Sequence, residues 1–440
     1  MKDENMKIEQ RLKNMKNFYI KVGDLIDRLP DAIPEKTRIT IKDTILGDSD
    51  LKKLMEGIDS HRPPRMFLIG RTGVGKSSLI NALCDSYVAQ VSDTKSCTTG
   101  ANMYQCKDGD RVLMEIFDTR GIAESVAIDE NVSAEEELIK EVNEFSPDVV
   151  IFMLNCTHRD DVNTDVEFLK KLSSEYQKVN QLELPIVTVV NKCDQMAPAR
   201  AVDPAAYPAN KIEKIEEVVR YYKGIIVKSG LKIRNIIGVS SVIDWKTADG
   251  VPVDVDDIPN LPQEDIENLQ MDFDGRYRIE DLRDILEKAI LDFDAQMGLR
   301  MALRLDALVK RIAKHLNGIF AGISATVALT PIPVSDIYIL IIIQSCLVAL
   351  IASLSGREIS LDTAKEFVLG LGGVVGAGYV FRLAAQQATK FVNVVWPGAG
   401  SLISSGVASS GTAAIGRTAI AYYIEGQSLE EAKRLFNKSK

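Results

Sequence analysis

A cluster of glycines followed by a lysine and a serine lies near residue 70. The octapeptide Gly70–Ser77 reads G-R-T-G-V-G-K-S, which has the spacing G-x-x-x-x-G-K-[ST]. Glycines at these places let the backbone wrap around an anion, so that successive amides point at phosphate oxygens beside a helix N-terminus. The lysine supplies a point charge for the β- and γ-phosphates, and the serine hydroxyl is a ligand for Mg²⁺. The predicted phosphate-binding residues are Gly70, Arg71, Thr72, Gly73, Val74, Gly75, Lys76, Ser77 and Ser78.

A second motif, Asp118-Thr119-Arg120-Gly121, follows the apolar run Val112–Phe117. A carboxylate at the end of such a strand can hold a Mg²⁺-bound water, and the Gly121 amide can reach a γ-phosphate. The motif is weak alone, but its order after a phosphate loop makes it informative.

A threonine that contacts both Mg²⁺ and the γ-phosphate is expected between these two motifs. The suitable cluster is the pentapeptide 96–100, S-C-T-T-G, in which we choose Thr99 and keep Thr98 as the alternative. The predicted catalytic residues are therefore Lys76, Thr99, Asp118 and Gly121. The predicted metal site consists of Ser77, Thr99 and, through a water, Asp118.

A third motif is expected to recognise the guanine base of the nucleotide. Asn191-Lys192-Cys193-Asp194 ends another apolar run. An aspartate carboxylate accepts hydrogen bonds from guanine N1–H and its exocyclic amine, whereas adenine would leave that carboxylate unpaired. Asn191 is expected to link this segment to the phosphate loop. The predicted guanine-binding residues are Asn191, Lys192, Asp194, Ser240 and Ser241, so the expected ligands are GTP or GDP with Mg²⁺.

Short apolar runs alternate with helical patterns from Arg65 onward, which predicts an α/β fold with a mixed, mostly parallel sheet of six strands and helices on both faces. Asp108-Gly109-Asp110 predicts a hairpin and therefore one antiparallel edge strand. The strand candidates are 66–69, 101–106, 112–117, 149–154, 186–190 and 236–239. Two stretches, 196–207 and the acidic 251–275, are expected to be surface insertions. A helix over 279–293 is expected to close the domain.

These motifs, taken in order, resemble the Era/TrmE-like branch of the translation-factor-type P-loop GTPases. The resemblance covers roughly residues 65–293 and implies hydrolysis of GTP to GDP with two switch loops. Ile122 stands where Ras-like enzymes place a glutamine, and Gly73 replaces an asparagine that helps TrmE relatives hold K⁺. We therefore expect slow basal hydrolysis that self-association or a partner stimulates.

The last third of the chain is strongly apolar. Between residues 316 and 356 the only charged side chain is Asp336, and glycines are frequent in the apolar segments that follow. Two apolar helices interrupted by Pro331 and Pro333 suit either a membrane-inserting hairpin or the core of a helical bundle. The region resembles a hydrophobic helical domain of uncharacterised bacterial GTPases. More distantly, the arrangement is similar to immunity-related GTPases, which implies that N- and C-terminal helices form one all-α unit.

The remaining composition narrows the class of protein. The net charge of −9 argues against broad nucleic-acid binding, and six scattered cysteines with three histidines give no zinc pattern. A charged N-terminus without an apolar signal core predicts a cytoplasmic protein, peripheral or integral on the inner face of the membrane if membrane-associated. We expect N-terminal helices over 1–61, a GTP-binding domain over 62–296 and a hydrophobic helical domain over 297–440.

Three functions fit these observations. The first is a GTP-hydrolysing switch that associates with a membrane through residues 316–356 and the glycine-rich helices. The second is a GTP-dependent scaffold that forms homodimers or larger assemblies and turns over little GTP. The third is an Era-like ribosome-assembly factor, although no RNA-binding module is visible.

Overall fold

The protein was analysed as a computed structural model, which describes residues 11, 13–27, 29, 35–71, 73–87, 92–96, 102–108, 111–118, 132–157, 162–329, 336–372 and 399–438. The chain divides into two compact units. One comprises His61–Arg304, and the other combines Met1–Ser60 with Leu305–Lys440. The all-α unit therefore draws on both ends of the sequence, as the resemblance implied. The unit that begins at His61 ends at Arg304, beyond the expected boundary at 296, because the helix over 293–303 packs within it.

The central sheet of the unit His61–Arg304 has the strand order β2-β3-β4-β1-β5-β6-β7. Strands β4, β1, β5, β6 and β7 pair in parallel, whereas β3 is antiparallel to β4, as the hairpin pattern predicted. The expected α/β fold is confirmed. Within the described residues the sheet contains seven strands, one more than the six expected. The sequence did not predict β2, because that segment is polar and carries no apolar pattern. The strands are β1 (Arg65–Ile69), β2 (Ser92–Ser96), β3 (Asn102–Asp108), β4 (Arg111–Asp118), β5 (Val149–Asn155), β6 (Ile186–Asn191) and β7 (Asn235–Gly238).

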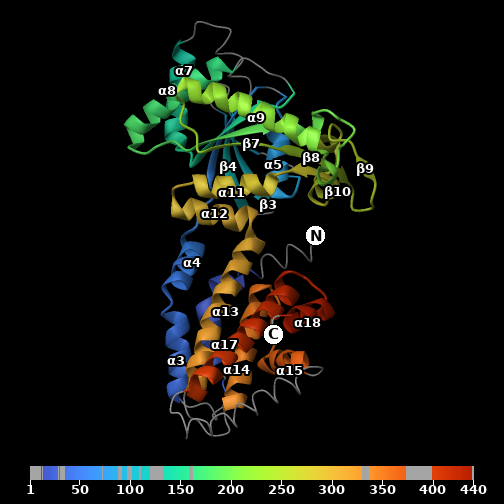
Figure 1. Ribbon diagram of the computed structural model, residues 1–440. Coiled ribbons are helices and arrows are strands. Elements are labelled where there is room, and N and C mark those ends of the chain that lie inside the picture. Colours follow the sequence, from blue (N-terminus) through green and yellow to red (C-terminus); the bar gives the residue numbers. More distant parts are fainter. Residues whose placement is uncertain are drawn as a thin grey trace. The chain divides into compact units, whose positions relative to one another are not determined.

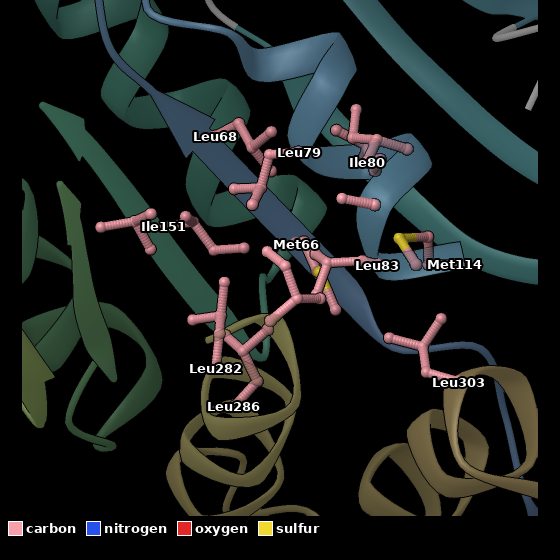
Figure 2. Close-up of a cluster of buried hydrophobic side chains, with 14 of the residues drawn as sticks. Met66, Leu68, Leu79, Ile80, Leu83, Met114, Ile151, Leu282, Leu286 and Leu303 are labelled. Atoms are coloured by element: carbon pink, nitrogen blue, oxygen red, sulfur yellow. The ribbon is translucent and has the colours of Figure 1, made fainter. Parts of the chain in front are cut away.

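Helices cover both faces of this sheet (Figure 1). One face packs against α7 (Val132–Phe145), α8 (Asn163–Asn180) and α9 (Ala209–Ser229). The other face packs against α5 (Lys76–Cys84), α11 (Ile279–Ala289) and α12 (Phe293–Leu303). Figure 2 shows the second core, where Met66 and Leu68 of β1 lie among leucines of α5 and α11. Alternate residues of β1 serve the two cores, since successive side chains of a strand point to opposite faces.

A small second sheet corrects one expectation. Residues 251–275 were expected to be a surface insertion, but they contain β9 (Pro252–Val253), α10 (Gln263–Glu267) and most of β10 (Gln270–Tyr277), and both strands pair with β8 (Ser240–Lys246). Ile258, Ile266 and Leu269 from this segment are buried in the same core as β1. Glu264 and Asp265, which lie between them, are exposed, so the high charge of the segment hid its packed apolar residues from sequence analysis.

The helical unit comprises α2 (Phe18–Asp27), α3 (Glu35–Leu46), α4 (Ser49–Ser60), α13 (Leu305–Leu329), α14 (Asp336–Leu354), α15 (Leu361–Gly372), α17 (Ala399–Ala419), the short π-helix η4 (Ile420–Ile424) and α18 (Leu429–Lys438). Several of these helices lie alongside one another in Figure 1, with α13 beside α17. Gly416 of α17 allows this approach, because a Cβ atom there would overlap Asn317 Oδ1 of α13.

Buried polar side chains connect three helices at the centre of this unit. Gln344 of α14 donates to the Thr412 hydroxyl (3.1 Å), which donates to the Ser324 hydroxyl of α13 (2.8 Å). All three side chains are buried. A linked polar set of this kind favours one alignment of the helices, because a slip would leave its members unpaired.

The apolar helix α14 lies inside the unit. Nearly every residue from Ile339 to Leu354 is buried, and a helix that is apolar all round is expected to be surrounded by protein or by lipid. Here α13, α15 and α17 surround the described part. Within the described ranges, none of the helices combines the length and the apolar character needed to cross a bilayer.

The N-terminal residues are tied to the C-terminal helices by polar contacts. Asn14 donates to the Ser353 carbonyl (2.6 Å), and Lys21 donates to the Glu358 carboxylate (2.6 Å). His315 of α13 is hydrogen-bonded to Asp48 (2.8 Å), whose carboxylate also accepts the first amides of α4. These contacts support the two chain ends as a single folded unit.

Candidate functional site

The phosphate loop has the backbone that its glycines predict. Gly73 (φ 77°) and Gly75 (φ 91°) both adopt the left-handed conformation, which costs other residues about 1–2 kcal/mol. At Gly75 a side chain is further excluded, because a Cβ would lie 2.6 Å from Asn191 Nδ2. Gly70 also passes close to the backbone of β5, where a Cβ would lie 2.9 Å from the Met153 carbonyl. Thr72 lies outside the described residues.

Lys76 opens α5 and is folded across the loop. Its side chain is buried, and its Nζ donates to the Gly70 carbonyl at 2.8 Å. Ser77 and Ser78 follow in the first turn and are exposed. Gly75, the N-cap of this helix, provides no side-chain hydrogen bond. The first turn of a helix has unpaired amides and a partial positive charge, so this end of α5 is suited to an anion.

Arg71 is oriented by an acid on a neighbouring helix. Its Nε lies 3.5 Å from Asp165 Oδ2, in the first turn of α8. The Asp165 side chain is only 7% exposed, whereas that of Arg71 is 40% exposed. Asp165 was not among the predicted site residues, because its partner is far away in the sequence.

Asn191 joins the guanine motif to the phosphate loop, as the sequence suggested. Its side chain is buried, and Nδ2 donates to the carbonyls of Val74 (3.0 Å) and Gly75 (3.4 Å). Its Oδ1 accepts a hydrogen bond from the Ser241 hydroxyl (3.1 Å). One amide group therefore holds three loops together at the carboxyl ends of β1, β6 and β7.

Asp194 is positioned by Ser240 and by its own backbone. The Ser240 hydroxyl donates to Asp194 Oδ1 at 3.0 Å. The preceding Cys193 is buried, and its amide donates to the Val239 carbonyl at 3.1 Å. Lys192 adopts a left-handed conformation (φ 65°), which turns the chain after β6. Ser240 and Ser241 are both buried and begin β8 rather than ending β7.

Lys211 of α9 contacts the segment that contains Asp194 and was not among the residues predicted from the sequence. Its side chain is fully buried, and Nζ donates to the carbonyls of Asp194 (2.5 Å) and Ala201 (2.7 Å). The ammonium also lies 4.3 Å from the centroid of the Tyr207 ring. Burial lowers the pKa of Lys211, and the nearby Asp194 charge partly opposes that effect. No local pattern marks this lysine, because its partners are backbone atoms elsewhere in the chain.

The end of β4 brings Asp118 near the phosphate loop. In the sheet register Asp118 is paired with Leu68 of β1, two residues before Gly70. The side chain of Asp118 and all of Thr98, Thr99 and Gly121 lie outside the described residues. Their predicted contacts therefore remain predictions.

The predicted Mg²⁺ ligands lie only partly within the described residues. The exposed Ser77 hydroxyl lies in the first turn of α5, and the β4 strand end places a carboxylate-bearing residue in the neighbouring register. Hydroxyl and carboxylate oxygens are the ligands that Mg²⁺ prefers. Among the residues that the structure describes, no three His, Cys, Asp or Glu side chains gather to hold a metal ion.

Comparison with known proteins agrees with this geometry. Residues 65–192 match the family described as 50S ribosome-binding GTPase. GTPase Era of Aquifex aeolicus is 29% identical over 199 residues, which cover 44% of this chain and 60% of that protein. The probable tRNA modification GTPase MnmE of Cyanidium caldarium is 27% identical over 183 residues, covering 40% and 34% of the two proteins. The chain thus spans less than two thirds of either relative.

A solved structure of an oligomerised bacterial dynamin pair, described in connection with the sensing and tethering of membranes, aligns with 97% of this chain and 78% of its own. Its TM-score is 0.30 at 14% identity. The fold, the phosphate loop and the linked guanine motif define a P-loop GTPase domain. Within that class, the domain of this chain is similar to the GTPase domains of Era and MnmE. The resemblance of the C-terminal helices to those of uncharacterised bacterial GTPases stays a prediction.

Proposed function

We propose that this protein binds GTP with Mg²⁺ and hydrolyses it to GDP, and that the two nucleotide states act as a switch. The observation that carries the proposal is the Asn191 side chain, which connects the phosphate loop to the guanine motif through Val74 and Ser241. Because of this connection, the proposed phosphate-binding and guanine-binding segments lie next to each other, as binding of one nucleotide requires. The family match supports the same conclusion.

The proposed roles follow from the chemistry of each group. Lys76 neutralises charge on the β- and γ-phosphates, while the backbone amides from Gly73 to Ser78 surround the phosphate oxygens. Ser77, Thr99 and, through a water, Asp118 hold Mg²⁺, which neutralises charge on the transferred phosphoryl group. The Gly121 amide contacts the γ-phosphate. Asp194 reads guanine, with Lys192 lying along the base.

Slow basal turnover is part of the proposal. Ile122 has no polar group with which to orient the attacking water, and the described residues of the loop offer Gly73 where an asparagine would assist K⁺. Catalysis is then left to electrostatic stabilisation by the phosphate loop. We propose that the group that positions the attacking water comes from a second molecule. That molecule is another copy of this chain, in a homodimer or larger assembly, or a partner protein.

Binding and turnover measurements test this function. Calorimetric titration with GTP, GDP and ATP in Mg²⁺ should show guanine nucleotides binding at least about 100-fold more tightly than ATP. Lys76→Met should abolish that binding, whereas the same change at the exposed Lys170 should not. Equal affinity for ATP and GTP would contradict the proposal. Turnover per molecule that stays negligible as protein concentration rises would favour a scaffold instead.

A second candidate function is association with a membrane through the helical unit. The observation that favours it is the scarcity of charge between residues 316 and 356, where Asp336 is the only charged side chain. Because α14 is buried where described, its contact with lipid would require the bundle to open. We propose a cytoplasmic protein that reaches the inner face of the membrane in one nucleotide state. Co-sedimentation with liposomes in GTP but not in GDP would support this, whereas co-sedimentation with ribosomal particles alone would favour an Era-like role.

A further inference from the structure

The environment of Lys211 is unusual for a charged side chain. The residue is 0% exposed, and its ammonium makes two short hydrogen bonds, to Asp194 O and Ala201 O. The Tyr207 ring covers it at 4.3 Å. Transferring an ammonium out of water costs several kcal/mol, and carbonyl hydrogen bonds with an aromatic face recover only part of that cost.

Both carbonyls that Lys211 binds belong to the segment after the guanine motif. The chain leaves Asp194, passes through residues 196–207 and enters α9 just before Lys211. The ammonium therefore links the start of α9 to Asp194 at the beginning of this segment and to Ala201 within it. Without a donor at this position, the partly buried Asp194 and Ala201 carbonyls would lose this hydrogen-bond partner.

Asp194 is consequently held at two points. Lys211 fixes its backbone carbonyl, and the Ser240 hydroxyl fixes one carboxylate oxygen at 3.0 Å. The Cys193 amide adds a third anchor through Val239. Only three rotatable bonds separate the carbonyl from the carboxylate oxygens, so fixing the peptide limits the direction in which the carboxylate can point.

We propose that Lys211 is a positioning residue that sets the preference of this site for guanine. It acts through Asp194, whose carboxylate must face both N1–H and the 2-amino group of the base. The selected ligand is a purine nucleotide whose base carries both the N1–H and the 2-amino group. Such a nucleotide is preferred over a hypoxanthine nucleotide, which lacks the 2-amino group. This inference rests on the proposed guanine-nucleotide function.

The test compares GDP with IDP on the full-length chain. Lys211→Met keeps the length of the side chain and removes its donors, and Lys214→Met is the matched control because Lys214 is exposed on the same helix. GDP affinity should fall about tenfold in Lys211→Met, whereas IDP affinity should fall less, so that the GDP:IDP affinity ratio shrinks. Lys214→Met should keep the wild-type ratio. A purely structural role would weaken both nucleotides equally.

A second variant keeps the test decisive if Lys211→Met fails to fold. Lys211→Gln removes the buried charge and carries its amide NH2 on a side chain one bond shorter, so it should reach only one of the two carbonyls and still lower the GDP:IDP ratio. Thermal melting of each variant identifies the folded ones. A folded variant at position 211 with the wild-type ratio would overturn the inference. A wild-type chain that binds GDP no better than ADP would overturn the proposed function as well, which is a distinguishable result.

Discussion

Replacing Asn191 by alanine removes the side chain that links the phosphate loop to the guanine motif. The amide donates to Val74 O at 3.0 Å and accepts from Ser241 Oγ at 3.1 Å, with a longer bond of 3.4 Å to Gly75 O. The two shorter bonds contribute about 1 kcal/mol each, and a buried carbonyl left unpaired adds roughly 1–2 kcal/mol. The total of about 3 kcal/mol corresponds to a loss of roughly 100-fold in GTP affinity if it falls wholly on the bound state.

The β-sheet beneath this link should survive the substitution. Residue 191 ends β6, and its backbone remains in register with Asn155 of β5. Part of the loss should appear as a lower melting temperature of the free protein, and the rest as weaker binding. Calorimetric titration with GTP and scanning calorimetry on the same preparation separate the two parts.

Two further variants identify the donor as the important group. Asn191→Asp keeps the size and the acceptor for Ser241 but cannot donate to Val74, so it should bind GTP no better than Asn191→Ala. Asn235→Ala, at an exposed position at the start of β7, should bind like the wild type. GTP affinity within about threefold of wild type together with an unchanged melting temperature in Asn191→Ala would refute the reasoning, since even one lost buried hydrogen bond should exceed that.

Two predictions concern the helical unit. Gly416→Ala should lower the melting temperature of this unit, because the added Cβ overlaps Asn317 Oδ1. Gly406→Ala on the same helix is the control, because its Cβ meets no atom within 4 Å, and it should be neutral or stabilising by up to about 1 kcal/mol. Equal melting temperatures of the two variants would contradict the packing argument. Burial acts to raise the pKa of Asp48, but hydrogen bonds from the α4 amides and from His315 lower it below its ordinary value of 3.8. The ionised form therefore stabilises the folded state above about pH 4, and this contribution is lost as the pH falls through the lowered pKa. Melting from pH 5 to pH 2.5 should show a shallower decline in Asp48→Asn than in the wild type.

The sequence predicted those parts of the site that depend on local chemistry. The left-handed glycines of the phosphate loop and the strand-end position of Asn191 follow from residue type and spacing alone. Lys211 and Asp165 could not be predicted in this way, because their partners are brought to them by tertiary structure. The acidic segment around Ile258 was misread, since three buried apolar residues are a weak pattern among many carboxylates.

The C-terminal helices show a different limit of sequence reasoning. A stretch as uniformly apolar as α14 has the same composition whether protein or lipid surrounds it, because periodicity disappears when all sides are buried. The alternative of a helical bundle agrees with the described part of α14, which is enclosed by α13, α15 and α17. The pairing of Asn14 with Ser353 could not be found from periodicity either.

The close approach of Arg62 to α12 has a consequence for how the chain folds. The Arg62 amide bonds the Asp294 carbonyl, and Gly298 admits the Arg62 backbone, so the two ends of the G domain are adjacent. If α2–α4 had to meet α13–α18 across a disordered segment of roughly 240 residues, loop closure would cost about 5 kcal/mol of entropy. A G domain that folds first converts this long loop into a short one. The contact between α2 and α14 forms only after α14 has been synthesised, so during synthesis the packing of α2 against α14 follows the completion of the G domain.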